Sequence, residues 1–173
     1  MEANTTTNEA AIKPLNPPHI DLDQKVIPTY QTMPKITVSY NNPYKATQRH
    51  QIQCSSYVYK ALQDYPDLEY KESFHIILLN RANQILGISC VGTGGLAGVV
   101  ADPKIVYQHA LMANASSIIL LHNHPSGNKA TSQADDQLTD KLVQAGKFLD
   151  LPVLDHIILT NDGYYSYADE GRL

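Results

Sequence analysis

The chain has 173 residues, 43% of them hydrophobic and 17% charged, which is ordinary for one globular domain with tails. Its 13 lysines and arginines are outnumbered by 17 acidic residues and form no dense cluster, so composition does not support direct DNA binding. No apolar run approaches the roughly 20 residues that cross a bilayer, and the opening MEANTTTNEAA has neither the basic nor the apolar part of a signal peptide. We therefore expect a cytoplasmic protein that does not enter a membrane, with Cys54 and Cys90 as free thiols, at least one of them buried.

The N-terminal part of the chain differs in character from the rest. Residues 1–34 are rich in threonine and proline and show no helical apolar period, so we expect a disordered tail there. We place one domain at 35–173, with the motifs concentrated at about 50–173. Alternating apolar and polar residues at 36–40 predict a short strand at its start.

The next predicted elements are a helix and a β-hairpin. Ser55 or Ser56 can cap a helix that runs to about residue 63, with Tyr57 and Ala61 facing inward and Val58 and Leu62 as further candidates. Two apolar segments joined by a short turn then predict a pair of antiparallel strands, the first so uniformly apolar that it should be covered on both faces. These strands are expected at 74–79 and 85–91, followed by a glycine-rich connection at 92–98.

Helices and strands alternate in the second half of the chain. Asp102 and Pro103 are typical of a helix start, and Ser132 can cap a longer helix. A mixed α/β fold follows, in which helices flank a mixed sheet. The core-facing residues are expected to be Val106, Ala110, Leu111 and Ala113 in the first of these helices and Leu138, Leu142, Ala145 and Leu149 in the second, and further strands are expected at 117–121, 153–159 and 164–166.

Two histidines one residue apart stand where an apolar strand ends. Residues i and i+2 of extended backbone point to the same side, so His122 and His124 can direct both imidazoles at one point. Asp135 lies in the first turn of the following helix and can fold back as a third ligand, as a hydrolytic zinc site requires. Two histidines and an aspartate suit Zn²⁺ without strongly excluding other divalent ions.

A carboxylate beside the metal is the second requirement of such a site, because it can carry a proton from the attacking water to the leaving group. Glu72 stands at the mouth of the first buried strand and is our candidate for this general base. Glu69, three residues earlier, is the competing candidate.

The run HNHPSG, with Ser132 and Asp135 at fixed distances after it, resembles the JAMM pattern H-x-H-x7-S-x-x-D, and in particular the RadC branch of the JAB/MPN family. The resemblance covers about residues 50–173 and includes the runs KESF, VADPK, LDHIIL and YYSYADEG. It implies a mixed sheet flanked by helices, and one zinc ion on His122, His124 and Asp135. It also implies general-base catalysis by Glu72, a Ser132 hydroxyl that polarises the scissile carbonyl and stabilises the oxyanion, and cleavage of peptide or isopeptide bonds. Proteins of the RadC branch carry a DNA-repair name.

The chain departs from the RadC pattern in two places. Many RadC proteins have a helix-hairpin-helix DNA-binding region before the JAB domain, whereas the residues before 50 are too few and too rich in proline for one. Many relatives also have an arginine where this chain has Lys104. The DNA-repair name suggests an alternative function, a metal-stabilised accessory module, without catalysis, in DNA repair or in a mobile element. The acidic balance and the missing region count against direct DNA contact by such a module. A nuclease of the HNH type is disfavoured because that motif is spread over a longer unit.

Several assignments stay open at this level. Ser132 and Asp135 also have the spacing of a capping box, with aspartate in place of the usual glutamate. In a capping box both side chains bond free backbone amides at a helix start. Asp136 could replace Asp135 as ligand. Asp155 and His156 are either a hydrogen-bonded pair in the core or residues that orient a zinc ligand or the loop.

Overall fold

The structure, a computed structural model, describes residues 45–63, 65, 68–94 and 101–173, all within the unit Val38–Leu173. The tail expected at 1–34 and the strand expected at 36–40 lie outside the described residues, as does most of the glycine-rich connection. Within the part described, no helix is both long and apolar enough to cross a membrane.

A five-stranded sheet forms the centre of the domain, with the strand order β2-β1-β3-β4-β5. Neighbouring strands are antiparallel except β3 and β4, which run parallel, so the sheet is mixed as predicted. The strands are β1 (Ser73–Leu79), β2 (Ile85–Thr93), β3 (Ser117–Asn123), β4 (Val153–Thr160) and β5 (Gly163–Ser166).

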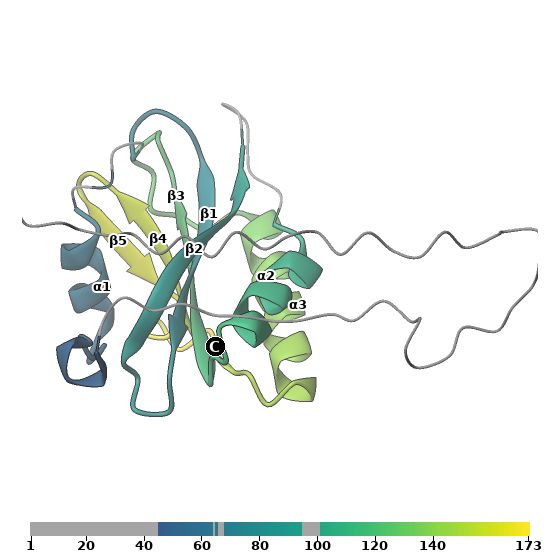
Figure 1. The fold of residues 1–173 in the computed structure, drawn as a ribbon. Helices are drawn as coiled ribbons and strands as arrows, with labels where there is room; N and C mark the ends of the chain where they lie inside the picture. The colour runs from purple at the N-terminus through teal and green to yellow at the C-terminus, as the bar shows by residue number, and fades with distance from the viewer. Residues whose placement is uncertain (1–44, 64, 66–67, 95–100) are drawn as a thin grey trace, which may run out of the picture. The chain divides into compact units, whose positions relative to one another are not determined.

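Helices cover both faces of this sheet (Figure 1). The short α1 (Ser55–Ala61), preceded by the 3-10 turn η1 (Ala46–Gln48), packs on one face. The helices α2 (Pro103–Met112) and α3 (Gln133–Phe148) pack on the other. Asp102 caps α2 as predicted: its Oδ1 accepts the Lys104 N–H at 2.9 Å.

The apolar runs of β1 and β3 follow from this layering, because alternate residues of a strand point to opposite faces. Ile76 belongs to the core beneath α2 and α3, and Ile77 to the core beneath α1. Burial of each such side chain stabilises the fold by about 1.5–3 kcal/mol. β3 is thus held in the middle of the sheet, between β1 and β4. The candidate site lies at the carboxyl end of β3.

Four expectations about the helices were wrong. The residue that caps α1 is Cys54, which forms no side-chain capping hydrogen bond, and Ser55 is already helical. Ala61 is exposed because this two-turn helix buries only Val58. Leu111 is 53% exposed since it follows the buried Ala110 by about 100° around α2, and Leu149 is 43% exposed because α3 ends just before it.

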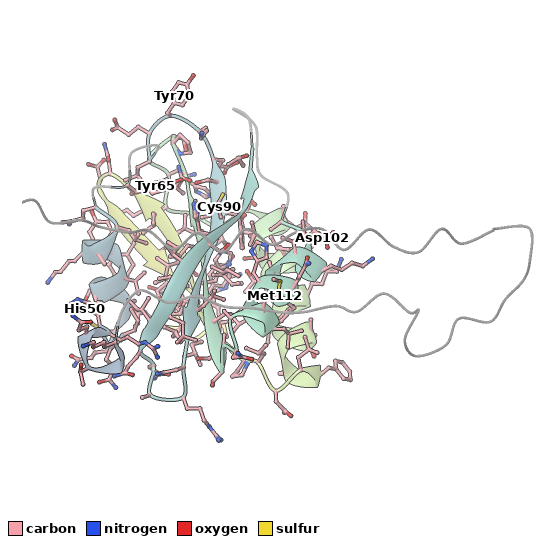
Figure 2. All side chains as sticks on the ribbon, viewed as in Figure 1. His50, Tyr65, Tyr70, Cys90, Asp102 and Met112 are labelled. Atoms are coloured by element: carbon pink, nitrogen blue, oxygen red, sulfur yellow. The ribbon has the colours of Figure 1, made fainter. Side chains whose placement is uncertain are left out.

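The expectation that at least one cysteine is buried was also wrong. Cys54 and Cys90 are both free and both exposed. Cys90, labelled in Figure 2, belongs to β2, an edge strand of the sheet, and its side chain faces solvent like that of Ile88 two residues before it.

Candidate metal centre

The two histidines of the motif converge at the end of β3. The side chain of His122 is 2% exposed, and its ring stacks on Phe74 of β1 with an interplanar angle of 7°. His124 is the first residue after the described strand, and its backbone N–H donates to the Leu159 carbonyl of β4 at 2.9 Å. The Nε2 atoms of the two imidazoles are only 2.9 Å apart.

Asp135 approaches the same point from the first turn of α3. Its Oδ1 lies 3.3 Å from the His122 Nε2, and its Oδ2 lies 3.8 Å from the His124 Nε2. One ligand atom from each of the three residues lies within 4.8 Å of the others. Ser132 and Asp135 also form a full capping box, in which the Asp135 N–H donates to the Ser132 Oγ and the Ser132 N–H donates to the Asp135 Oδ2. The carboxylate therefore serves the helix start and faces the histidines at once.

The Asp135 carboxyl stays ionised and contributes a negative charge at this point. Burial on its own would raise the pKa of the Asp135 carboxyl, but the hydroxyl and the backbone N–H of Ser132 hold that pKa below its usual range, and a protonated His122 imidazole would lower it further.

The outer nitrogens of the histidines indicate where their protons are. The His124 Nδ1 lies 2.6 Å from the Asn128 carbonyl oxygen, which can only accept, so this Nδ1 carries the proton. The His122 Nδ1 lies 2.8 Å from the Nε2 of His156. If His122 donates there, both motif histidines, when neutral, turn bare Nε2 lone pairs toward each other and toward a carboxylate. Such a donor set is repulsive without a cation and fits a metal ion.

Glu72 lies beside this donor set, directly before β1. Its Oε1 is 3.8 Å from the His124 Nε2, and the side chain is 19% exposed. Glu69, the competitor, bonds Asn161 instead. Tyr70, next to Glu69, points outward from the same turn (Figure 2).

Asn123, between the two histidines, clamps the segment that carries Glu72. Its side-chain amide donates to the carbonyls of Leu68 and Lys71, both at 2.8 Å. Its Oδ1 accepts the N–H and the hydroxyl of Ser73, both at 2.9 Å. The backbone on each side of Glu72 is thus bonded to the strand that carries the histidines. The sequence did not predict this role, although the middle residue of H-x-H must point away from the side on which the two histidines converge.

We expect the Asn123→Ala variant to lose about 2–4 kcal/mol of folding stability, because it leaves buried backbone groups of the 68–73 segment without partners. Urea unfolding of the zinc-free chain measures this loss. Asn128→Ala is a comparison on the exposed loop and should lose less. Equal stability of the wild type and Asn123→Ala would contradict the clamp.

The other acidic candidates lie elsewhere. Asp136 accepts the Tyr167 hydroxyl at 2.7 Å and pairs with Arg172 at 2.8 Å, and these contacts lower its pKa. Asp155 accepts the Ser166 hydroxyl and the Ala168 N–H. Burial raises the pKa of Asp155. The structure therefore brings His156 to the ligands, and it directs Asp155 to a different set of partners.

The folding stability of the zinc-free chain should fall between pH 7 and pH 5. Burial lowers the pKa of His75 and holds that of His156 well below its usual range. Below about pH 6.5 these two histidines take up protons in the unfolded chain but stay neutral in the folded chain. The two histidines therefore contribute to folding stability above that pH, and the contribution is lost below it. For the fully buried His156, the free energy of unfolding falls by at most about 1.4 kcal/mol for each pH unit below that point. Urea unfolding at each pH measures it, and a His75→Gln variant should have a shallower slope. Constant or rising stability toward pH 5 would contradict this.

Comparison with known proteins identifies the domain. Residues 52–172 match the family model of the RadC-like JAB domain. The chain is 43% identical to a UPF0758 protein of Flavobacterium johnsoniae over 100 residues, which are 58% of this chain and 44% of that protein. It is 41% identical to a UPF0758 protein of Methanosarcina mazei over 109 residues, 62% of this chain and 48% of that protein. It thus spans about half the length of these curated relatives. The matched region contains the whole donor set, and the chain belongs to the family of RadC-like JAB domains.

Proposed function

We propose that this chain is a zinc-dependent hydrolase of the JAMM type that cleaves amide bonds in peptides or isopeptides. The observation that carries the proposal is the convergence of two imidazole Nε2 atoms and the Asp135 carboxylate, with a second carboxylate, Glu72, 3.8 Å from one of the imidazoles. Three protein ligands that leave a position for water are typical of catalytic zinc.

A zinc ion on these ligands would lower the pKa of a water molecule and polarise a carbonyl. Glu72 is partly exposed and belongs to no described ion pair except that with His124, so it is free to accept the proton of the attacking water and pass it to the leaving amine. Asn123 keeps the backbone around Glu72 at a fixed distance from the ligands.

Ser132 is the proposed donor to the oxyanion. Its hydroxyl donates to the Asp135 Oδ2 at 2.7 Å, so its hydrogen points toward the ligand carboxylate. A rotation about the Cβ–Oγ bond redirects the hydroxyl to a substrate oxygen, while the backbone N–H of Ser132 keeps its bond to Asp135. Oxyanion stabilisation by Ser132 therefore needs a rotation of the hydroxyl and leaves the capping box partly in place.

The test is a comparison of zinc-loaded chain, chain stripped by a chelator, and stripped chain with zinc restored, on a panel of peptides and isopeptide-linked peptides. We expect hydrolysis in the first and third samples and its loss in the second. Hydrolysis that survives complete removal of metal would contradict the proposed mechanism. A folded, zinc-loaded chain that cleaves nothing in the panel would favour the accessory module instead.

A further inference from the structure

A chain of hydrogen bonds runs from the backbone of α3 to the ring of His122. The Thr139 hydroxyl donates to the Asp135 carbonyl at 2.6 Å. The same Thr139 Oγ1 lies 2.6 Å from the Nδ1 of His156. The Nε2 of His156 in turn lies 2.8 Å from the Nδ1 of His122.

The direction of every proton in this chain follows from its first member. A carbonyl oxygen can only accept, so the Thr139 proton points to Asp135, and Thr139 must accept from His156. The Nδ1 of His156 therefore carries its proton, and its Nε2 is an acceptor. His122 must then donate from Nδ1, which leaves the Nε2 of the neutral imidazole as a lone pair beside Asp135.

His156 is also fixed in place. It is 0% exposed, and its ring stacks on Tyr167 with a centroid distance of 4.9 Å and an interplanar angle of 9°. The partner that a metal-binding histidine usually has here is a carboxylate, a carbonyl or a water, none of which needs a tautomer set for it. The Nε2 of a histidine can either accept or donate a hydrogen bond. His156 therefore orients His122 correctly only if another residue fixes the proton of His156 on Nδ1.

We propose that Thr139 and His156 form a relay that sets the tautomer of His122 and so keeps its Nε2 free for the metal. His156 and Thr139 are thus positioning residues for a ligand, and the relay rests on the proposed metal site. Without the Thr139 hydroxyl, His156 can move its proton to Nε2, and His122 then has to carry its own proton on the metal-facing nitrogen.

The matched test is Thr139→Val against Thr139→Ser. Valine keeps the shape of threonine and removes the hydroxyl, whereas serine keeps the hydroxyl. Removal of an outer partner of a metal ligand typically lowers affinity about 10–100-fold, which is the loss of zinc affinity that we expect for Thr139→Val. Thr139→Ser should stay close to wild type. Chelator competition with zinc, on full-length chain at pH 8, measures both.

Nitrogen NMR of the zinc-free chain adds a readout that loss of packing would not give. Wild type and Thr139→Ser should show His122 protonated at Nδ1, and Thr139→Val should show a mixture of tautomers. Equal zinc affinity in all three chains, or a wild-type His122 without a proton at Nδ1, would overturn the relay. If the wild type binds no zinc, the proposed function fails, while the tautomer of His122 still tests the relay.

Discussion

Protein purified without added metal is expected to contain about one zinc ion per chain, and the Asp135→Asn variant is expected to contain far less. The asparagine keeps the size of the side chain and removes the charge that faces the two Nε2 atoms. We expect the zinc affinity to fall by more than the roughly 10–100-fold that follows loss of an outer partner, because a ligand itself is changed. Metal analysis of the purified protein and chelator competition measure these two quantities.

Asp136→Asn is the matched control, since it makes the same chemical change one residue along α3. The Asp136 carboxylate pairs with Arg172 and Tyr167, away from the histidines, so this variant should keep its zinc. Zinc should also raise the unfolding midpoint of the wild type and of Asp136→Asn, but hardly that of Asp135→Asn. A well-folded wild type that binds no zinc when zinc is supplied would mean that the histidines and the capping box are structural.

The convergence of ligands was predictable because it depends on local geometry. The i, i+2 spacing of His122 and His124 directs both rings to one side of a strand, and the capping signal of Ser132 predicts where α3 begins. The sequence presented the capping box and the metal ligand as competing interpretations of Asp135. The structure contains the capping box and also places Asp135 against the histidines, because one carboxylate oxygen faces Ser132 and the other faces His122.

Other parts of the site could not be predicted, because they depend on how distant elements pack. Thr139 and His156 are 17 residues apart, and their contact requires α3 to lie over β4. The clamp by Asn123 joins residues about 50 apart and requires the register of β1 against β3. One fact was available from spacing alone: Asp155 and His156 are adjacent in a strand, so their side chains point to opposite faces and cannot both orient one ligand.

The Glu72→Gln variant should bind zinc like the wild type and hydrolyse the substrate about 10²–10⁴-fold more slowly. Glutamine has the shape of glutamate but cannot take a proton from water. The loss should appear in kcat, with KM little changed, since Glu72 acts on the attacking water. The measurement is steady-state hydrolysis of a peptide or isopeptide that the wild type cleaves, on samples with matched zinc content.

Glu69→Gln provides the control, because Glu69 lies three residues before Glu72, is exposed, and bonds Asn161 rather than the histidines. Its rate should equal that of the wild type. The zinc content of Glu72→Gln separates two roles for this carboxylate, whose Oε1 lies 3.8 Å from the His124 Nε2. A slow variant with full zinc identifies a general base, and a variant that loses its zinc identifies a fourth ligand. A variant that keeps both zinc and rate removes Glu72 from the mechanism and leaves the proton transfer to another group.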